Sequence, residues 1–502
     1  MFNNIIFYLK NSAKRFPDKV AFRDGEKEIT FSELDRNARL LASNINSRLN
    51  GLVKQPIGIY LPKGVDAVIA FMASIYSGNF YTPIDPTMPR VRLEKLLGIL
   101  NPAMIITNNK YKNYFLSELI LIDEVKPEDM NDNLLDSIAN EVIDTDILYI
   151  MFTSGSTGDP KGVIISHRAV IDYIDWLSDV FEFNESTIFG NQAPFSFDNS
   201  VLDLYSTIKN GCETVIIPEE MFLSSKRLCT FINENKINTI FWVPSAMILV
   251  ANSRILEKIS MNQLTKIMFA GEVMPTKQLN VWRRFVPNAL YANLYGPTEI
   301  AVDCTFYIVD REFGDEESLP IGAACKNTQI LVLNEKDELV SEGEIGELCV
   351  RGSCLAHGYY GNPQKTKEVF VQNPLNHKYP ERIYRTGDLV KYNEYKEMIY
   401  IGRKDTQIKH RGYRIELGEI ETAVSSALEI EQCCAIYDND NKQIVIFVTP
   451  ENINKNALYA HIKNMLPNYM LPGLIVSRAS MPLNQNGKID RLALTYSLKE
   501  KL

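Results

Sequence analysis

Small and hydroxylic residues separate two apolar runs at residues 149–167, where the chain reads YIMFTSGSTGDPKGVIISH. Glycines let successive backbone N–H groups point into one concavity, Ser and Thr hydroxyls add donors, and Lys161 adds a compact positive charge. Such a set of groups suits a polyphosphate, although a Gly- and Ser-rich stretch can also be a solvated turn. A Walker A loop is excluded, because Gly155 is followed five residues later by Pro160 and then by Lys161 and Gly162.

The bulk composition limits the classes of protein to which the chain can belong. Its 502 residues are 45% hydrophobic and 23% charged, which is typical of a water-soluble chain with more than one domain. The formal net charge of −9 argues against nucleic acid or an anionic membrane as the main partner. The eight cysteines include no CxxC pair and are expected to be reduced thiols. No run has a secretory pattern or the ~20 apolar residues of a bilayer span, so we expect a cytoplasmic protein.

Short apolar runs alternate with helical spacing through the N-terminal part of the chain. The strand-like runs are QPIGIYL (55–61), MIIT (104–107), TVIIP (214–218), NTIFWVP (238–244) and KIMFAG (266–271), and GVDAVIAFMASIYSG (64–78) has helical spacing. This alternation predicts an α/β fold with largely parallel sheets. From about Ile330 the runs are joined by turn-rich, charged segments, which predicts a small antiparallel β subdomain.

The C-terminal part of the chain has a pattern of its own. A helix is expected at 416–428, a strand at 443–450 and a second helix around 456–466. These elements are enough for a small α+β domain. We therefore expect a large N-terminal domain of packed α/β sheets over residues 1–404 and a small C-terminal domain over 405–502.

The stretch FTSGSTGDPKGVIISH resembles the phosphate-loop signature of the adenylate-forming superfamily, which includes acyl-CoA synthetases, luciferases and the adenylation domains of nonribosomal peptide synthetases. Similar stretches follow in family order, namely ITFSELDRNARLLA (29–42), GNFYTPIDPTMPRVRLE (78–94), FSFDNS (195–200), NLYGPTEIAV (293–302), GELCVRGSCLAHGYYGNP (346–363), YRTGDLV (384–390), IGRKDTQIKHRGYRIELGEIE (401–421) and NQNGKIDR (484–491). Size and MFAGEVMP (268–275) make the chain most similar to free-standing amino-acid adenylation domains, in particular the D-alanine–carrier protein ligases. It departs from those ligases at Ala270, where they have cysteine, and at Asp303, which leaves another amino acid open.

The resemblance implies a site for ATP and Mg²⁺. Its nucleotide-binding residues would be Thr153, Ser154, Gly155, Ser156, Thr157, Gly158, Lys161, Gly271, Asn293, Leu294, Tyr295, Gly296, Pro297, Thr298, Asp388, Tyr400, Arg403 and Lys488. Glu299 would be the magnesium ligand, because a single carboxylate beside phosphates suits that ion. Asp388 would accept the ribose hydroxyls, and Arg403 would reach ribose or phosphate with its planar fork. Without the resemblance, these side chains would equally be a solvated carboxylate, a turn cap and a surface arginine.

The same resemblance assigns the central catalytic group to the C-terminal domain. Lys488 would bridge the substrate carboxylate and the phosphate oxygens, with Glu299 and Thr153 as the other catalytic residues. The domain would be mobile, with Asp405 at the hinge, and would then present the KHRGYRIE face for transfer of the acyl group to a thiol. From its composition alone, NQNGKIDR would be a polar surface turn with one of many exposed lysines.

The substrate class depends on FSFDNS, where Asp198 would pair with the α-ammonium of an amino acid, or would instead cap the helix that follows. Alignment to the family's pocket positions gives Asp198, Asn199, Leu202, Trp242, Met268, Ala270, Leu294, Val302, Asp303 and Lys488. The bulky members of this set would exclude an aromatic substrate. A buried Asp303 without a partner would need a substrate hydroxyl or amine, unless it bonds backbone amides or faces away.

Together these features predict an AMP-forming ligase. It would activate a small amino acid, serine or alanine first and a short diamino acid next, as the aminoacyl-adenylate with release of pyrophosphate. A phosphopantetheine thiol of a carrier protein would accept the aminoacyl group, with coenzyme A as the alternative acceptor. The rival hypotheses are a P-loop-type kinase, which releases ADP, and a noncatalytic nucleotide-binding protein. No nucleic-acid partner is expected.

Overall fold

The computed structural model describes residues 3–25, 27–115, 118–125, 130–155, 159–483 and 489–499. Its α-helices are α1 (Ile6–Arg15), α2 (Phe31–Arg48), α3 (Val65–Tyr76), α4 (Arg90–Leu100), α5 (Asp132–Glu141), α6 (His167–Phe181), α7 (Ser200–Asn210), α8 (Ser225–Glu234), α9 (Pro244–Asn252), α10 (Thr276–Phe285), α11 (Pro363–Val369), α12 (Leu417–Ser425), α13 (Lys455–Lys463) and α14 (Arg491–Lys499). The helices predicted at 64–78, 416–428 and 456–466 are confirmed as α3, α12 and α13.

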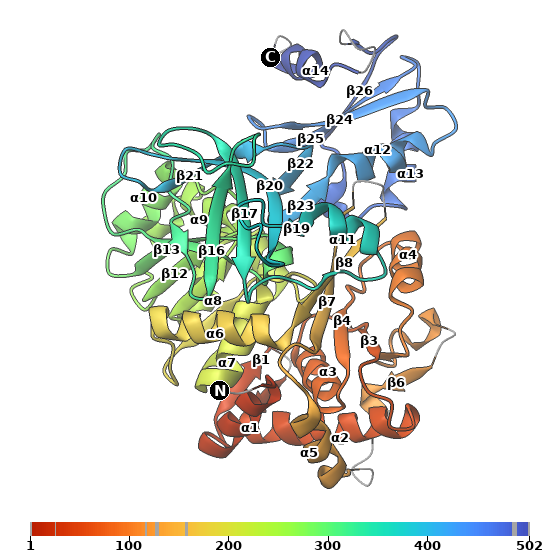
Figure 1. The fold of residues 1–502 in the computed structure, drawn as a ribbon, viewed down its shortest axis with the longest axis vertical. Coiled ribbons are helices and arrows are strands. Elements are labelled where there is room, and N and C mark those ends of the chain that lie inside the picture. The colour runs from red at the N-terminus through yellow and green to blue at the C-terminus, as the bar shows by residue number, and fades with distance from the viewer. Residues whose placement is uncertain are drawn as a thin grey trace. The chain divides into compact units, whose positions relative to one another are not determined.

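Two large sheets form most of the N-terminal part of the chain (Figure 1). In the order of its strands, the first consists of β18 (Gly358–Tyr359), β8 (Lys161–Ser166), β7 (Ile147–Thr153), β4 (Phe80–Pro83), β3 (Pro56–Ile59), β5 (Met104–Thr107) and β6 (Leu119–Leu121). The second consists of β15 (Ala323–Ala324), β14 (Thr305–Ile308), β13 (Leu290–Tyr295), β12 (Lys266–Phe269), β11 (Thr239–Trp242), β9 (Ile188–Asn191), β10 (Glu213–Ile216), β1 (Val20–Arg23) and β2 (Glu28–Thr30). Neighbours such as β3 and β4, or β11 and β12, run parallel with helices between them, which confirms the predicted α/β fold.

A third sheet is antiparallel, as the change of pattern near Ile330 predicts. Its strands are β16 (Thr328–Leu333), β17 (Gly346–Gly352), β20 (Arg382–Tyr392) and β19 (Phe370–Gln372), with β21 (Met398–Arg403) also paired to β20. The register between β17 and β20 is irregular between Glu347 and Cys349. Such an irregularity changes the direction in which nearby side chains and amides point.

The contacts divide the chain into two compact units. One contains residues 1–86, 101–151 and 162–404, and the other contains 87–100, 152–161 and 405–502. The expected domain boundary after residue 404 stays a prediction. In the second unit, β22 (Gln407–His410) pairs with β23 (Tyr413–Glu416), and β24 (Gln432–Asp438), β25 (Gln443–Thr449) and β26 (Leu474–Ser477) form a separate sheet.

A buried ion pair joins distant segments of this second unit. Arg92 of α4 bonds the carboxylate of Glu419 on α12, and the two residues are 6% and 3% exposed. Neither charge would be stable at this depth without the other, because an unpaired ion loses its hydration and gains nothing in return. The C-terminal part of the chain therefore depends on a segment from the N-terminal part.

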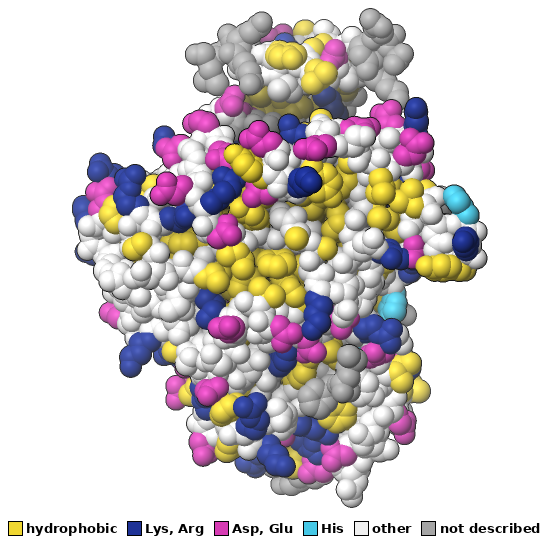
Figure 2. All heavy atoms as spheres, turned by 60° about the vertical axis from the view of Figure 1, so that its left-hand side comes forward, with side chains coloured by type: hydrophobic (Ala, Val, Ile, Leu, Met, Phe, Trp, Pro, Cys, Tyr) yellow, Lys and Arg dark blue, Asp and Glu magenta, His cyan; other side chains and the backbone are white. Residues whose placement is uncertain are grey.

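The surface of the protein is of mixed polarity. Figure 2 shows one face, on which basic and acidic side chains are interspersed with apolar patches. Among the described helices, none has both the length and the apolar character that a bilayer crossing requires. All eight cysteines are free.

Part of the predicted site follows parallel strands at one edge of the nine-stranded sheet. Strands β9, β12 and β13 end at Asn191, Phe269 and Tyr295, directly before the segments that contain Asp198, Gly271 and Glu299. Ligands of α/β proteins bind at the carboxyl ends of such strands. In the part of the chain that forms the seven-stranded sheet, α3 connects β3 to β4, and every residue of this helix except Asp66 is buried.

Candidate active site

The predicted phosphate loop begins where strand β7 ends. Thr153 is the last residue of the strand, and its buried hydroxyl oxygen has no hydrogen-bond partner in the described part of the chain. Gly155 is required by space, because a Cβ there would lie 2.0 Å from the carbonyl oxygen of Asp159. A buried hydroxyl that lacks a partner is a group that a phosphate oxygen could bond.

Ser154 and Lys161 of the same loop bond the hairpin of strands β22 and β23. The Ser154 hydroxyl donates to the carbonyl oxygen of Arg414 at 2.7 Å and accepts from the backbone N–H of Glu416 at 3.1 Å. The Lys161 ammonium lies 3.2 Å from the Glu416 carboxylate, and the two side chains are 10% and 9% exposed. A carboxylate thus pairs with the loop lysine where a phosphate group could pair with it instead.

The segment after strand β13 contains a sharply bent backbone. A Cβ at Gly296 would lie 2.3 Å from the carbonyl oxygen of Val302, so only glycine fits. Ala301 and Val302 have φ values of 55° and 79°, which strain the backbone, above all for the β-branched valine. Glu299 is fully buried, and its Oε1 accepts a hydrogen bond from the hydroxyl of Tyr359 at 2.7 Å. The bend therefore holds one carboxylate inside the protein in a fixed orientation.

The structure brings together Asp388, Arg403 and Tyr295, three of the predicted nucleotide-binding residues. Nη1 of Arg403 lies 2.7 Å from Oδ1 of Asp388, and the hydroxyl of Tyr295 donates to Oδ2. Asp388 itself is 1% exposed. Burial, and then the charge of Asp388, raise the pKa of Tyr295 well above its ordinary value, so the phenol keeps its proton and donates. A carboxylate held in this way presents a fixed acceptor to a pair of hydroxyls.

Asp198 directly precedes Asn199, the N-cap of helix α7. Asn199 makes no side-chain capping bond, and both predicted roles of Asp198, at the α-ammonium or at the start of the helix, stay predictions. Two phenols lie close enough to sense its charge, because Asp198 adds to the effect of burial in raising the pKa of both Tyr149 and Tyr173. The hydroxyl of Tyr149 is buried and has no partner within the described residues. Asp198 therefore lies near two buried phenols, in the segment between β9 and α7.

The apolar residues predicted for the pocket share one buried cluster, with a single exception. The members are Leu202, Met268, Ala270, Leu294 and Val302, each at most 2% exposed. Trp242 belongs instead to a second cluster, where its indole N–H donates to the carbonyl oxygen of Gly190 at 2.8 Å. Phe241 pairs with Met268 and lies in the first cluster. Because successive strand residues face opposite sides, packing favours Phe241 over Trp242 as the pocket residue of β11.

Asp303 has a partner that the sequence did not indicate. Its carboxylate is 2% exposed, and Oδ2 accepts a hydrogen bond from the hydroxyl of Tyr173 on α6 at 2.6 Å. This length is typical of a charge-assisted bond. The expectation that Asp303 needs a substrate group for a partner is therefore corrected, since a side chain 130 residues away supplies one. No period or motif in the sequence marks Tyr173 for this role.

The remaining predicted nucleotide-binding residues that the structure describes belong to the compact unit of residues 1–86, 101–151 and 162–404. Gly271 follows β12 with a φ of 94°, which favours glycine. The amide of Asn293 donates to the carbonyl oxygen of Pro320 at 2.8 Å, so it is used to hold the fold. Pro297 and Thr298 complete the turn before Glu299, and the ring of Tyr400 lies 6.4 Å from that of Tyr295.

Part of the predicted site cannot be placed. Lys488, Ser156, Thr157 and Gly158 lie outside the described residues. Asp405, the predicted hinge, is the first C-terminal residue of the second unit, and its Oδ1 accepts from the backbone N–H of Gln407 at 3.1 Å. The hinge assignment stays a prediction.

The donor set fits a magnesium ion that arrives with a nucleotide. Among the residues that the structure describes, no group of three or more His, Cys, Asp or Glu side chains could hold a metal. Magnesium usually takes one or two carboxylates and completes its octahedral shell with phosphates and water. The single buried carboxylate of Glu299 satisfies that requirement.

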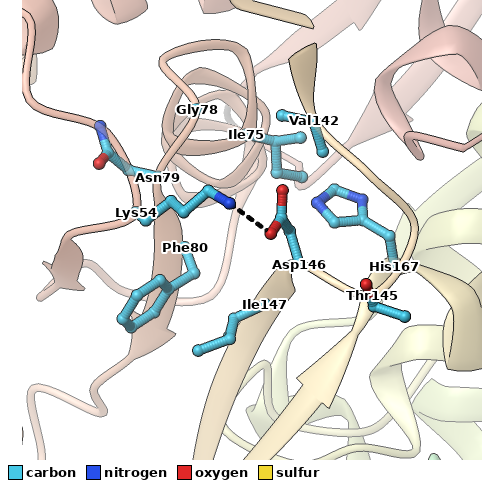
Figure 3. A pocket seen from close by; sticks show the side chains of 10 residues that line it. All are labelled: Lys54, Ile75, Gly78, Asn79, Phe80, Val142, Thr145, Asp146, Ile147 and His167. Carbon is cyan, nitrogen blue, oxygen red and sulfur yellow. Dashed lines mark hydrogen bonds and ion pairs between the residues drawn. The ribbon is translucent and has the colours of Figure 1, made fainter. Parts of the chain in front are cut away.

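A separate pocket lies at the amino ends of strands β4 and β7. It is lined by Lys54, Ile75, Gly78, Asn79, Phe80, Val142, Thr145, Asp146, Ile147 and His167 (Figure 3). Lys54 is already paired with Asp146 at 2.7 Å, and Nδ1 of His167 accepts from the backbone N–H of Ile5. Burial lowers the pKa of His167 to about 4, so the ring is neutral near pH 7. None of the predicted site residues lines this pocket.

Two family profiles match the chain. The profile described as AMP-binding enzyme covers residues 9–360, and that of the AMP-binding enzyme C-terminal domain covers residues 419–488. The chain belongs to the AMP-binding enzyme family. Membership confirms the resemblance to adenylate-forming enzymes that the sequence motifs indicate, whereas the narrower likeness to D-alanine–carrier protein ligases stays a prediction.

Relatives of this AMP-binding enzyme include synthases of very different length. Zwittermicin A synthase ZmaJ from Bacillus cereus is 30% identical over 503 residues, which cover 97% of this chain and 94% of the relative. Tyrocidine synthase 3 from Brevibacillus parabrevis is 32% identical over 492 residues, but the match spans 97% of this chain and only 7% of that protein. Bacitracin synthase 1 from Bacillus licheniformis is 31% identical, and the chain spans 9% of its length.

Solved structures of adenylation domains share the fold. The Vibrio cholerae adenylation domain AlmE, crystallised with glycyl-adenosine-5′-phosphate, has a TM-score of 0.85 at 23% identity and covers 100% of this chain and 98% of its own. A four-domain nonribosomal peptide synthetase, holo-AB3403 bound to AMP and glycine, has a TM-score of 0.71 at 26% identity. That match covers 98% of this chain and 36% of the synthetase.

Proposed function

We propose that this protein activates a small amino acid with ATP and transfers the aminoacyl group to the phosphopantetheine thiol of a carrier protein. The observation that carries the proposal is the buried Asp388 carboxylate, which Arg403 and Tyr295 hold in a fixed position and which the family resemblance would assign to the ribose hydroxyls. Family membership supports ATP as the nucleotide. The synthetase bound to AMP and glycine supports an amino acid as the second substrate.

In the first half-reaction, a substrate carboxylate oxygen attacks the α-phosphorus of ATP in line. The new C–O–P linkage forms as the bond from the α-phosphorus to pyrophosphate breaks. Two anions must approach each other, so cationic side chains lower the barrier, and Lys161 and Lys488 are the candidates. Magnesium, held by Glu299, would neutralise charge on the leaving pyrophosphate. Asp388 and Arg403 fix the ribose, which keeps the reacting phosphorus in place.

In the second half-reaction, a thiolate attacks the carbonyl carbon of the aminoacyl-adenylate. The thioester forms as the acyl–oxygen bond breaks, and AMP leaves with the electron pair. An acyl-adenylate is too reactive to be a sensible end product, which supports a thiol acceptor. Coenzyme A remains the alternative acceptor, and thioester formation with coenzyme A in place of a carrier protein would favour it.

The substrate is proposed to be small. Asp198 would pair with the α-ammonium, and the bulky side chains of Leu202, Met268 and Leu294, which share one buried cluster, would limit the volume of the pocket. Asp303, which Tyr173 orients, would add a carboxylate to the pocket. Serine or alanine is therefore the first choice and a short diamino acid the next.

An exchange assay with labelled pyrophosphate tests this function over all common L- and D-amino acids. We expect label to enter ATP with a small amino acid and not without one. Best activity with phenylalanine or tryptophan, or an unchanged preference between serine and alanine in an Asp303→Ala variant, would defeat the proposed pocket. Formation of ADP would favour a kinase, and tight ATP binding without exchange would favour a noncatalytic protein.

A further inference from the structure

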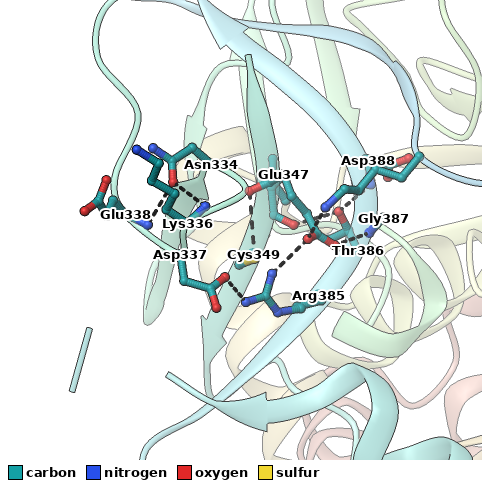
Figure 4. Close-up of polar contacts among 12 residues, drawn as sticks. Asn334, Lys336, Asp337, Glu338, Glu347, Cys349, Arg385, Thr386, Gly387 and Asp388 are labelled. Atoms are coloured by element: carbon teal, nitrogen blue, oxygen red, sulfur yellow. Dashed lines mark hydrogen bonds and ion pairs between the residues drawn. The ribbon is translucent and has the colours of Figure 1, made fainter. Parts of the chain in front are cut away.

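The carboxylate of Glu347 bonds two backbone segments that belong to the nucleotide site. Glu347 lies on β17 at the register irregularity opposite β20 and is 6% exposed. Its Oε1 accepts the backbone N–H of Gly387 at 3.1 Å. Its Oε2 accepts from the ammonium of Lys404 at 3.2 Å and from Nη1 of Arg385 at 3.0 Å (Figure 4).

Each bonded segment contains one of the residues proposed to bind ribose. Gly387 precedes Asp388, and its φ of 73° bends the chain so that its amide points at Glu347. Lys404 follows Arg403, and its own backbone N–H donates to the carbonyl oxygen of Gly387 at 2.9 Å. Together with Glu347, the two segments form a closed set of bonds on the side of the Asp388–Arg403 pair that Gly387 and Lys404 occupy.

A second bond on the same bend limits the freedom of Asp388 further. The hydroxyl of Thr386 donates to the carbonyl oxygen of Leu348 at 2.7 Å and accepts the backbone N–H of Asp388 at 3.0 Å. The backbone of Asp388 is thus tied to β17 through residues 386 and 387, and the segment of Arg403 is tied to β17 through the side chain of Lys404. Glu347 is the group common to both connections.

We propose that Glu347 is a positioning residue for the nucleotide site, which sets the geometry of Asp388 and Arg403 toward the ribose. The inference rests on the proposed function, because it takes Asp388 and Arg403 as the ribose-binding pair. Glu347 acts through the residue next to each of them, by a bond to the backbone of Gly387 and a bond to the side chain of Lys404. Arg385 pairs with both Glu347 and Asp337. Its bond to Glu347 helps to satisfy the second oxygen of that buried carboxylate.

A glutamine at this position would keep the size of the side chain but not its bonding. Both oxygens of Glu347 face donors, the Gly387 amide on one side and two cations on the other. An amide group would turn its NH₂ toward one of these donors in either orientation. Glu347→Gln is therefore expected to displace one of the two segments while leaving the core packing unchanged.

The test compares Glu347→Gln with a matched control, Asp337→Asn, which removes the other partner of Arg385 and leaves the contacts to Gly387 and Lys404. The rate at which labelled pyrophosphate is exchanged into the nucleotide is measured with ATP, 2′-deoxy-ATP and 3′-deoxy-ATP. We expect Glu347→Gln to raise the KM for ATP about tenfold. The KM for the amino acid should stay within about twofold, since the amino-acid site does not depend on this bend.

The deciding quantity is the discrimination between ATP and its deoxy analogues. If Glu347 aims Asp388 at the ribose hydroxyls, the ratio of the KM for deoxy-ATP to the KM for ATP falls toward one in Glu347→Gln and stays at the parent value in Asp337→Asn. A merely structural defect would raise every KM together and leave the ratio unchanged, which would overturn the inference. An equal effect of Asp337→Asn would also overturn it.

Failure of the proposed function gives a different result. A parent enzyme that shows no amino-acid-dependent exchange would contradict that function whatever Glu347 does. Direct calorimetric binding of ATP and 2′-deoxy-ATP to the parent and to Glu347→Gln then tests the inference by itself. A folded variant, with a melting curve like that of the parent, and an unchanged ratio of dissociation constants would refute the role of Glu347.

Discussion

The hydrogen bond between Tyr173 and Asp303 gives the sharpest quantitative test of the structure. The Tyr173→Phe variant removes one hydroxyl from a site where the two residues are 5% and 2% exposed. The bond measures 2.6 Å, and its acceptor is a carboxylate. Loss of a charge-assisted bond from a buried acceptor costs about 2 kcal/mol, roughly twice the value for a neutral pair.

The expected change in melting temperature follows from this free energy. A compact unit of several hundred residues unfolds with an entropy of about 0.8 kcal/mol/K, so 2 kcal/mol corresponds to a decrease of about 2–3 °C. Differential scanning calorimetry resolves a shift of that size. The matched control is Tyr81→Phe, because the buried Tyr81 hydroxyl bonds the neutral Tyr205 hydroxyl at 2.7 Å. Its decrease should be about half as large.

A double-mutant cycle separates this bond from other effects of the substitution. Asp303→Ala and Tyr173→Phe should be strongly non-additive, since each removes the same interaction. The double variant is therefore expected to melt close to the less stable of the two single variants. Additive decreases, or a decrease for Tyr173→Phe no larger than that for Tyr81→Phe, would refute the bond and with it the view that Tyr173 orients Asp303.

Further predictions concern catalysis, the phosphate loop and pH. Lys488→Ala should abolish adenylate formation and largely spare transfer from a preformed aminoacyl-adenylate, because the lysine is proposed to serve only the first half-reaction; equal losses in the two assays would contradict this division of labour. Glu416→Gln should lower the KM for ATP several-fold, because Lys161 would then bind phosphate without first breaking its ion pair with Glu416. A raised KM for ATP in the exchange assay would contradict this prediction. Burial raises the pKa of Asp203 from 3.8 to about 7, so the folded protein retains a proton that the unfolded chain has lost, and stability falls as pH rises between these values. Melting curves of Asp203→Asn should show this decline reduced by up to about 1.4 kcal/mol per pH unit, and an unchanged slope would disprove the assignment.

Elements with a strong local period were predictable from the sequence. The run MIIT at 104–107 coincides with β5, and QIVIFVTP at 443–450 coincides with β25 apart from its last residue. The ends of a short apolar strand are marked by the polar and turn-forming residues next to it in the sequence, so the strand can be located from local sequence alone. Gly155 and Gly296 both stand where a Cβ has no room, so glycine is the residue type that these two positions require, whereas their predicted contact with a nucleotide stays a prediction.

Side-chain partners across the fold were not predictable in the same way. Tyr173 and Asp303 are separated by 130 residues, and only the packing of α6 beside the segment after β13 brings them together. The choice between Phe241 and Trp242 depends on which face of β11 each occupies, and a shift of one residue reverses it. Glu347 was quoted within a motif but given no role, because its partners Gly387 and Lys404 lie on other strands.

The ion pair of Arg92 and Glu419 restricts how parts of this enzyme can be exchanged with those of relatives. A chimaera that joins residues 405–502 to a foreign N-terminal part would bury Glu419 without its arginine, and an uncompensated buried charge costs several kcal/mol. Transfer of segments 87–100 and 152–161 together with the C-terminal part would retain Arg92 and also the pairing of Lys161 with Glu416. The unit that can be transplanted is thus defined by contacts in space and consists of three separate stretches of the chain.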